Sequence, residues 1–501
     1  MRRFHPLITG TLLLTAVGFF CRILGFFYRI FLSRTIGAEG LGLYQMIFPI
    51  HGIAFALCAG PIQTSLSRLT AASPEKGRAF LRVSLALSLS IALPLTSLIY
   101  TFADFLAARV LLAPECAPLL PALALSIPFC AIHACCCGYY YGLKKTAVPA
   151  FSQVVEQCIR IFSVLLIVHV CHTNRIPITV LLAVWGLLIG EAASAVFCLL
   201  VYGCSKSVAI LPNANTPITP LLLPLLTMAL PLMANRLTLS FLQSLEAIFV
   251  PNQLLLSGLS RVESVSIYGV LTGMALPFVL FPSAITNSLA VVLLPAVSEA
   301  QAQNQPDKIE HTISMALRYS LYMGILCVGL FTRFGPALGE TFYHNADAGR
   351  FIQILSWLCP FLYLATSSGS ILNGLGKTKL TFFHHLVSLL IRIAFVWFGI
   401  PEFGIRACLW GMLASEMLLA LLHILALRRI VPCDWNAWIL IGKPVFCLLC
   451  ALWLFRLFPE TLPLPAGLPD FFRTAVQILL LSTMYLLFLL FFHRKQSPAS
   501  T

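Results

Sequence analysis

The chain has 501 residues, of which 59% are hydrophobic and only 10% are charged, and its formal net charge is +14. Its mean hydropathy is +0.92, which a water-soluble domain would reach only with a very large exposed apolar surface. The composition therefore excludes a soluble protein and predicts a protein that crosses a membrane many times.

The apolar residues are grouped into long segments. Because one bilayer crossing needs roughly 20 mostly apolar residues, the chain offers about fourteen crossings. They lie at 7–32, 41–67, 79–103, 117–141, 150–170, 177–203, 217–246, 264–294, 311–332, 351–373, 379–400, 405–427, 437–457 and 471–493. The segments are rich in leucine and lack the alternating pattern of barrel strands. The expected fold class is an all-α polytopic membrane protein with about 14 transmembrane helices.

One stretch of the first half recurs in the second half, at an offset of about 232 positions without a gap. Pro128, Gly142, Lys145, Thr146 and Arg160 correspond to Pro360, Gly374, Lys377, Thr378 and Arg392. Trp185, Gly186 and Glu191 are likewise matched by Trp410, Gly411 and Glu416. Matches between such rare residue types predict a duplicated unit, and duplications that enclose a substrate path are typical of transporters.

The distribution of Lys and Arg predicts the orientation of the chain. With the N-terminus in the cytoplasm, the cytoplasmic ends and loops hold about sixteen of these residues, including Arg68 and Lys144, and the opposite loops hold about nine. An even number of helices then places both termini in the cytoplasm, and the repeat is parallel. We expect a six-helix lobe at 1–205, its repeat at 206–430 around a central cavity, and two further helices with a short cytoplasmic tail at 431–501.

The sequence lacks the motifs that are typical of several function classes. The basic residues are scattered over short loops and form no single basic face, so we expect no nucleic-acid partner. The chain has no Walker loop, His-Glu-x-x-His helix or Gly-x-Ser-x-Gly elbow, so we expect a protein that is not an enzyme and has no cofactor. Any work must then draw on a gradient, of protons or sodium ions, or on the downhill flux of the substrate itself.

The seventeen cysteines raise the question of metal binding. Most lie inside predicted helices, and Cys135, Cys136 and Cys137 are consecutive, so a helix would point them in directions roughly 100° apart. We therefore do not expect this triplet to hold zinc, and we expect reduced, buried thiols that pack between helices, with no metal site.

Ionisable residues at membrane depth are the candidate site residues, because a charge there is costly unless it faces water, a partner or a substrate. Arg22 and Arg29 are seven positions apart and share one face of the first helix, while Arg236 lies in the seventh helix with Asn235 and Gln243. We expect these five residues to line a polar cavity and bind an anionic substrate. Arginine suits a phosphate because its planar guanidinium donates two parallel hydrogen bonds.

A second group is expected to act in coupling or gating. Glu156 and Arg160 have the i,i+4 spacing of an intrahelical ion pair, which serves equally as a structural pair, and Glu246 lies in the seventh helix. Arg392 repeats Arg160, but Ser388 stands where the acid of the first copy would be. Arg392 should therefore find a partner on another helix or face a wet cavity, and we expect it to join the substrate-binding residues.

Three further charged residues have a structural interpretation. Arg34 lies near the end of the first helix, where its long side chain can reach the interface. Glu191 and Glu416 occupy the same place in the two repeats, and we expect them to fix helix packing through hydrogen bonds.

Three motifs carry a resemblance to a known family. They are Arg22-Ile-Leu-Gly-Phe-Phe-Tyr-Arg29 with Ser33-Arg34-x-Ile-Gly37-Ala-Glu-Gly40, then Tyr268-Gly-x-Leu-Thr-Gly-Met274 with Pro277, and Leu294-Pro-Ala-Val-Ser-Glu-Ala300. Over essentially its whole length, the chain resembles the stage V sporulation protein B family. That family belongs to the multidrug, oligosaccharidyl-lipid and polysaccharide exporter superfamily. The resemblance implies two helical lobes around a cavity that opens to one face of the membrane at a time.

The resemblance also implies a function. A polyprenyl-diphosphate-linked saccharide or peptidoglycan precursor would move to the outer leaflet of the bacterial cytoplasmic membrane, for cell-wall, polysaccharide or spore-cortex synthesis. The diphosphate would face Arg22, Arg29 and Arg236 while the lipid tail stays in the bilayer. Membrane lipids and cell-wall synthases are the further partners that the resemblance implies.

The chain departs from the lipid II flippases of the superfamily at two places. Those proteins have Arg-x-Leu-Gly-Phe-x-Arg in the first helix, whereas one extra residue separates the arginines here and Tyr28 stands at the second arginine position. Gly269 and Val270 replace an Asp-Arg pair. A teichoic-type, capsular or spore-cortex precursor therefore stays open beside lipid II.

Two other interpretations stay open. A cation-coupled multidrug antiporter of the same superfamily would need an acidic cavity, but only Glu156 and Glu246 stand against three or more arginines. A non-transporting membrane scaffold of a wall-synthesis complex would require no charges buried at membrane depth. The charge balance favours an anionic substrate.

Overall fold

The computed structural model describes residues 6–204, 219–431, 436–457 and 470–494. The residues that the structure describes are 92% helical and form no β-strand, which confirms the all-α polytopic fold. The two termini and the predicted lobe boundary at 205/206 lie outside the described residues, so the predicted topology and the predicted domains stay predictions.

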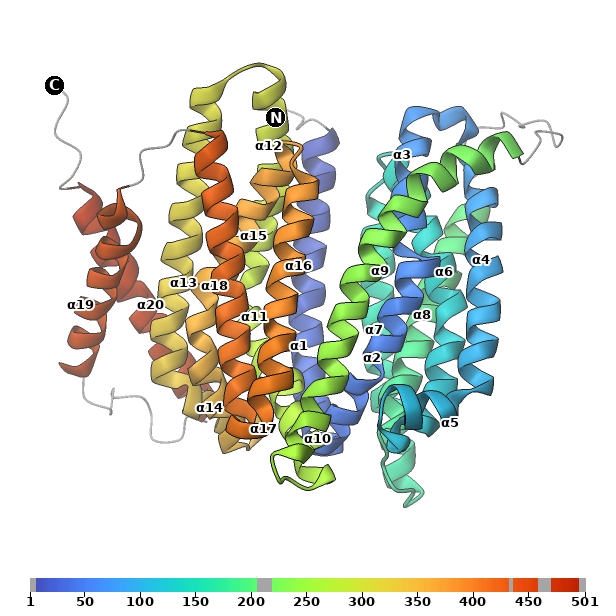
Figure 1. Ribbon diagram of the computed structural model, residues 1–501, viewed down its shortest axis with the longest axis horizontal. Coiled ribbons are helices and arrows are strands. Elements are labelled where there is room, and N and C mark those ends of the chain that lie inside the picture. Colours follow the sequence, from blue (N-terminus) through green and yellow to red (C-terminus); the bar gives the residue numbers. More distant parts are fainter. Residues whose placement is uncertain (1–5, 205–218, 432–435, 458–469, 495–501) are drawn as a thin grey trace. The chain divides into compact units, whose positions relative to one another are not determined.

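The chain divides into two compact units, Met1–Gly269 and Val270–Thr501. The described helices of the first unit are α1 (Pro6–Met46), α2 (Phe48–Cys58), α3 (Gly60–Ala72), α4 (Gly77–Thr101), α5 (Ala103–Phe105), α6 (Leu120–Gly142), α7 (Ala147–Thr173), α8 (Leu181–Cys204), α9 (Thr219–Leu256) and α10 (Arg261–Gly269), with the short turns η1 (Pro74–Lys76), η2 (Leu106–Val110) and η3 (Pro114–Leu119). Within this unit, α6 packs against α3, α4 and α8, and α7 packs against α8 (Figure 1). The residues of α6 are therefore largely surrounded by other helices.

The second unit contains a similar set of long helices. Its described elements are η4 (Val270–Ala275), α11 (Leu276–Leu280), α12 (Ser283–Ala302), α13 (Pro306–Tyr343), α14 (Ala346–Leu355), η5 (Ser356–Leu358), α15 (Cys359–Gly374), α16 (Thr378–Ala394), η6 (Phe395–Gly399), α17 (Ile400–Phe403), α18 (Ile405–Ile430), η7 (Trp438–Gly442), α19 (Lys443–Leu457) and α20 (Asp470–Arg494). Here α15 packs against α12, α13 and α18, while α19 and α20 pack against each other and against α13 (Figure 1).

Fourteen helical runs of the described chain are long and apolar enough to cross a membrane, as predicted. The predicted helices 7–32 and 41–67 are not separated by a loop, because α1 continues to Met46 through a kink. The kink lies at Gly37, whose φ of 72° is in the left-handed region that favours glycine.

The predicted helix at 264–294 is interrupted. One candidate crossing ends at Leu280 and the next begins at Ser283. Pro282 stands between them and has no backbone N–H to donate to the preceding turn, which accounts for the break.

The predicted repeat is visible in the close approach of paired helices. A Cβ atom on Gly142 of α6 would lie 2.7 Å from the carbonyl oxygen of Ser67 on α3. A Cβ atom on its counterpart Gly374 of α15 would lie 2.9 Å from the carbonyl oxygen of Leu294 on α12. Each glycine therefore lets two helix backbones approach at the same place in its copy.

Two further features repeat. The turn after each of these helices has a left-handed residue, Lys144 with φ 59° and Gly376 with φ 74°. In the next helix pair, a Cβ atom on Gly186 would lie 3.5 Å from the carbonyl oxygen of Arg160, and one on Gly411 would lie 3.6 Å from that of Arg392. The matched residues of the sequence thus occupy matched positions in the fold.

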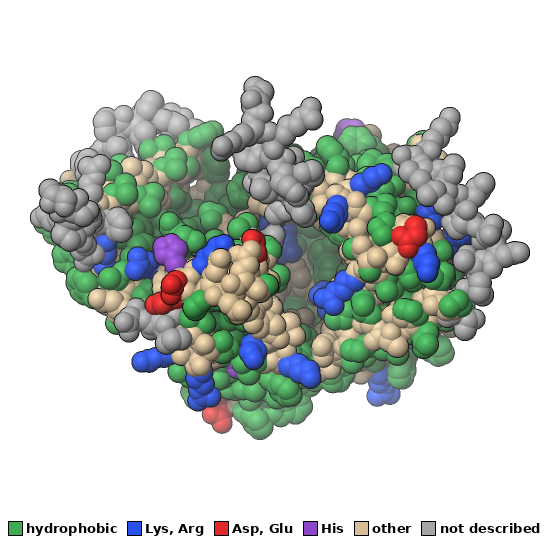
Figure 2. All heavy atoms as spheres, turned by 90° about the horizontal axis from the view of Figure 1, so that it is seen from above, with side chains coloured by type: hydrophobic (Ala, Val, Ile, Leu, Met, Phe, Trp, Pro, Cys, Tyr) green, Lys and Arg blue, Asp and Glu red, His purple; other side chains and the backbone are tan. Residues whose placement is uncertain are grey.

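Basic side chains are more frequent than acidic ones on the face shown in Figure 2. In the first unit this face lies at the end where α3 finishes and α9 begins (Figure 1). It is the face that the bias of Lys and Arg predicts to be cytoplasmic.

The glycines at the helix crossings give a test of the fold. We expect Gly142→Ala and Gly374→Ala each to lower the free energy of unfolding by about 1–3 kcal/mol, because the new methyl group meets a backbone oxygen that cannot rotate away. Thermal unfolding of the purified protein in detergent, followed by tryptophan fluorescence, measures the loss. Gly52→Ala is the control, since nothing lies within 4 Å of its added Cβ. Equal stability of all three variants would contradict the close helix approach.

Candidate functional site

A cavity of about 620 Å³ lies within the first unit, between α2, α3, α6 and α9. Its lining residues are Phe55, Gly60, Pro61, Gln63, Thr64, Ser67, Arg68, Tyr141, Leu232 and Arg236. Two of these ten described residues are arginines and none is acidic. The cavity is therefore basic, and hydroxyl and amide groups surround its charges.

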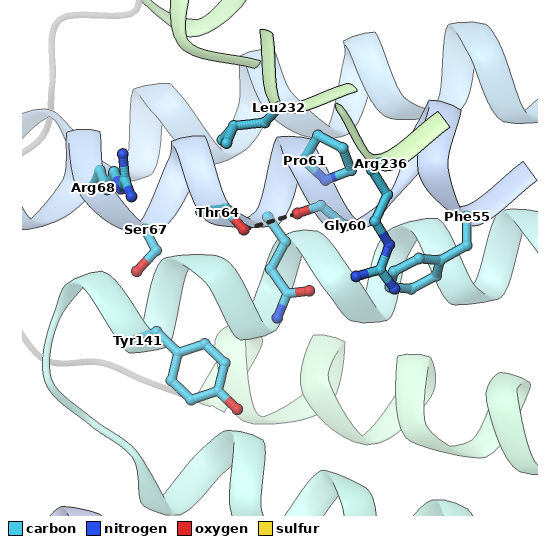
Figure 3. Close-up of a pocket in the computed structure, with 10 residues that line it drawn as sticks. Phe55, Gly60, Pro61, Thr64, Ser67, Arg68, Tyr141, Leu232 and Arg236 are labelled. Carbon is cyan, nitrogen blue, oxygen red and sulfur yellow. Dashed lines mark hydrogen bonds between the residues drawn. The ribbon is translucent and has the colours of Figure 1, made fainter. Parts of the chain in front are cut away.

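The geometry of α3 explains why polar side chains gather there. The helix begins again at Gly60-Pro61 after the break at Ala59, with the proline in the first turn, where its missing N–H costs no hydrogen bond. Residues 63, 64, 67 and 68 then share one face of the helix, because positions three and four apart lie above one another. That face turns toward the cavity (Figure 3).

Arg236 is held beside an aromatic ring. Its guanidinium carbon lies 5.5 Å from the centroid of Phe55 (Figure 3). A cation over a ring face is attracted without being neutralised, so this contact positions the guanidinium and leaves its charge for another partner. The hydroxyl of Thr64 donates to the carbonyl oxygen of Gly60 at 3.0 Å and so retains its oxygen as an acceptor.

The structure brings only part of the predicted substrate-binding set to this cavity. Arg236 lines it, whereas Arg22 and Arg29 on α1 and Asn235 and Gln243 on α9 are not among the lining residues, although all five side chains are exposed. Arg392 belongs to α16 of the second unit and is half-buried.

Arg68 lines the cavity although the sequence suggested only a cytoplasmic loop charge. The signal that could have found it is the polar face of α3, with Gln63, Thr64, Ser67 and Arg68 at helical spacing directly after Gly60-Pro61. The apolar composition of 41–67 predicts a membrane crossing and conceals this polar face.

A buried ion cluster lies between α6, α7 and α8 of the first unit, formed by His133, Glu156, Arg160 and Glu191. Arg160 Nη2 contacts Glu156 Oε1 one turn away and lies 4.0 Å from Glu191 Oε1. His133 Nδ1 lies 3.8 Å from Glu191 Oε2 and 4.0 Å from Glu156 Oε2. Each of the four side chains has an exposed fraction of 15% or less.

The close packing of α8 on α7 makes this cluster possible. A Cβ atom on Gly190 would lie 3.0 Å from the carbonyl oxygen of Glu156 and 3.1 Å from Arg160 Cβ. Because Gly190 precedes Glu191, its missing side chain lets the Glu191 carboxylate approach Arg160. With both carboxylates ionised and His133 neutral, the cluster holds two negative charges and one positive charge.

The sequence predicted part of this cluster. The ion pair indicated by the i,i+4 spacing of Glu156 and Arg160 is present. Glu191, interpreted as a packing residue, joins the pair from α8. His133 was missed because a single histidine in an apolar helix gives no local signal. Glu246 is buried on α9 and lies outside the four residues of the cluster.

The second unit does not repeat this set of residues. Ala365 stands at the position of His133, and Ser388 stands at the position of Glu156. The Ser388 hydroxyl donates to the carbonyl oxygen of Ser415 at 2.9 Å and so ties α16 to α18. The two copies therefore share their helix packing but differ in their buried polar groups.

A mostly apolar cavity of about 540 Å³ lies within the second unit, between α13, α15 and α19. Leucine, isoleucine, valine and aromatic side chains form most of its lining, and Arg333 and Arg456 lie in it as well. Such a surface suits a hydrocarbon chain with an anionic group at one end.

Comparisons with known proteins place the chain in a family. Residues 7–301 match the model of the polysaccharide biosynthesis protein family, and residues 231–398 match the MatE model. Stage V sporulation protein B of Bacillus subtilis (strain 168) is 28% identical over 85% of this chain and 84% of the relative. Lipid II flippase MurJ of the same organism is 22% identical over 77% of this chain and 76% of the relative.

Solved structures show the same fold. A structure of lipid II flippase MurJ in an inward closed conformation superposes with a TM-score of 0.75 and 17% identity, over 97% of this chain and 99% of that one. An inward-facing multidrug resistance MATE family transporter gives a TM-score of 0.67 and 17% identity, over 82% of this chain and 94% of that one. The chain belongs to the polysaccharide biosynthesis protein family and is a multi-pass bacterial membrane protein of the transporter superfamily that includes MATE proteins and MurJ.

Proposed function

We propose that the protein is a flippase that moves a polyprenyl-diphosphate-linked saccharide or peptidoglycan precursor to the outer leaflet by alternating access. The observation that carries the proposal is the basic cavity of the first unit, which holds Arg68 and Arg236 and no acidic residue among those that line it. Two permanently charged groups without an acidic neighbour in their cavity favour an anionic ligand.

The chemistry of a diphosphate fits this cavity. A guanidinium donates two parallel hydrogen bonds to phosphate oxygens, and Gln63, Ser67 and Tyr141 offer further polar groups at the wall. Both guanidinium groups belong to exposed side chains, so a ligand that enters from solvent can reach them. Pairing with arginine would lower the cost of moving a charged headgroup through a membrane.

The lipid tail of such a substrate has a separate requirement, because an isoprenoid chain must remain in an apolar surrounding. The bilayer supplies such a surrounding, so the tail would stay in the lipid while the headgroup enters the basic cavity. The names of two relatives, a stage V sporulation protein and a lipid II flippase, support a wall or spore-cortex precursor as the saccharide. Cell-wall synthases would then be partners, and both termini would lie in the cytoplasm.

The two alternatives have less support. A cation-coupled drug antiporter would bind a positive ligand, which the two arginines of the cavity would repel. A non-transporting scaffold would have no need for a basic cavity inside a helical unit. We also keep Arg22, Arg29, Asn235, Gln243 and Arg392 as proposed contacts of the substrate at other stages of its passage.

Removal of the two cavity charges tests the proposal. We expect Arg68→Gln with Arg236→Gln to weaken binding of a polyprenyl-diphosphate saccharide by about 100-fold or more, because each lost charge-assisted hydrogen bond contributes roughly 1.5–3 kcal/mol. Native mass spectrometry of the purified protein measures binding of this lipid and of cationic drugs. Arg236→Lys should recover only part of the affinity, since an ammonium keeps the charge and loses the planar fork.

Arg82→Gln is the matched control, because Arg82 is exposed on α4 and does not line the cavity. A double variant that binds the lipid as the control does would contradict the proposed site. Drug binding that survives in the double variant, with no lipid bound by the native protein, would favour the antiporter.

We further propose that Glu156, Arg160 and Glu246 act in coupling or gating. Arg160→Met should lower the free energy of unfolding by about 3–5 kcal/mol, because it leaves the carboxylates of Glu156 and Glu191 buried without their cation. Arg160→Lys should retain most of this stability and slow transport at unchanged lipid affinity. Thermal unfolding and a flipping assay measure the two effects, and Arg82→Met is the control. A Met variant as stable as this control would contradict the ion cluster.

A further inference from the structure

A second set of polar side chains adjoins the ion cluster and has a different chemistry. One ring nitrogen of His133 and the sulfur atoms of Cys137 and Cys198 lie within 4.8 Å of one another. His133 and Cys137 are one turn apart on α6, and Cys198 comes from α8. Both cysteines are buried, with exposed fractions of 5% and 0%.

The two ring nitrogens of His133 face different groups. Nδ1 points to the carboxylates, at 3.8 Å from Glu191 and 4.0 Å from Glu156. Nε2 lies 2.9 Å from Ser152 Oγ, which in turn lies 3.7 Å from Cys137 Sγ. The nitrogen on the side of the thiols is therefore Nε2, and the other nitrogen is directed at carboxylate oxygens.

Ser152 Oγ donates to the carbonyl oxygen of Pro149 at 2.9 Å, so His133 Nε2 is the donor to Ser152 here and releases its proton when it binds a metal. A histidine that binds a metal through one nitrogen commonly donates its other N–H to a carboxylate, which fixes the ring and its tautomer. Glu191 is buried, with an exposed fraction of 8% for the whole residue. Its Oε2 atom accepts no hydrogen bond within the described structure. It is thus available to accept the Nδ1 hydrogen of His133 when Nε2 binds a cation.

We propose that His133 Nε2, Cys137 Sγ and Cys198 Sγ bind one Zn²⁺ ion, with Ser152 Oγ or a water molecule as the fourth ligand. Zinc bonds of about 2.0–2.3 Å place tetrahedral ligand atoms roughly 3.3–3.8 Å apart, so the set closes around the ion by contracting about 1 Å. Such a movement is within the reach of side-chain rotation.

The ligand types select the metal. Thiolate and imidazole ligands suit zinc, whereas magnesium and calcium require oxygen ligands. The two positive charges of Zn²⁺ equal the two negative charges of the thiolates, so loading the site adds no net charge at membrane depth. The carboxylates alone are a poorer site, because Arg160 already contacts Glu156.

The proposed ion would join α6 to α8 beside α7. The proposed metal site does not depend on which substrate the protein carries. This proposal departs from the sequence analysis, which predicted buried thiols and no metal site. Only Cys137 of the three belongs to the set, and its partners come from one turn earlier and from another helix.

Metal analysis of the full-length protein in detergent tests this inference. The protein is incubated with Zn²⁺, passed through gel filtration and measured by plasma mass spectrometry. We expect about one zinc ion per chain in the native protein and a loss of at least tenfold in zinc affinity in Cys137→Ser and Cys198→Ser. Cys135→Ser is the matched control, since Cys135 is equally buried on α6 and lies outside the set.

A second measurement does not depend on the variants being stable. Co²⁺ added to the native protein should give the intense ultraviolet absorption of thiolate coordination, and Zn²⁺ should displace it. Absence of both zinc and this absorption would overturn the inference. Equal zinc content in the Cys135, Cys137 and Cys198 variants would also overturn it. So would binding of Cu⁺ without Zn²⁺. A disulfide between Cys137 and Cys198 in the freshly reduced and isolated protein would overturn it too.

Discussion

The ion pair between Glu156 and Arg160 lies in α7, a largely apolar helix, and its burial constrains the packing of the neighbouring helices. Neither charge could remain there without the other, because an unpaired buried ion costs several kcal/mol. The pair also requires further polar groups, which Glu191 and His133 supply from α8 and α6. These contacts require α6, α7 and α8 to pack closely, and Gly186 and Gly190 permit the approach of α8 to α7.

The arginines of the basic cavity have the opposite environment. Arg68 and Arg236 line a space without an acidic side chain among its described walls, and Arg236 rests against an aromatic ring that leaves its charge in place. An arginine paired within the protein stabilises the fold, whereas an arginine that faces an open cavity is available for a ligand. This difference in surroundings separates Arg160 from Arg236, although both lie in apolar helices.

The two copies of the duplicated unit share their helix packing but differ in their buried polar groups. Backbone contacts are kept, as the crossings at Gly142 and Gly374 show. The buried polar groups have diverged, since the acid and histidine of the first copy are a serine and an alanine in the second. Packing at a helix crossing tolerates few residue types, while a buried polar group can be replaced when its partners are replaced with it.

The fold was largely predictable from the sequence, and the candidate site only in part. Long apolar segments and the spacing of rare residues predicted fourteen helices, the repeat and the Glu156–Arg160 pair, because these depend on local composition and on neighbours along one helix. Arg68, His133 and Cys198 were missed, since their significance depends on which helices meet. The kink at Gly37 and the break at Pro282 were also missed, because apolar composition continues across both positions.

In the proposed function, the basic cavity carries an anionic lipid-linked headgroup across the membrane. The most direct test reconstitutes the protein into liposomes with a fluorescent polyprenyl-diphosphate saccharide and follows how fast the label becomes accessible to an impermeant quencher. The expected result is that the native protein accelerates this movement over protein-free liposomes and that the Arg68→Gln, Arg236→Gln double variant does not, although it is folded and inserted. Native protein that leaves the rate unchanged, or a double variant as fast as the native protein, would contradict it.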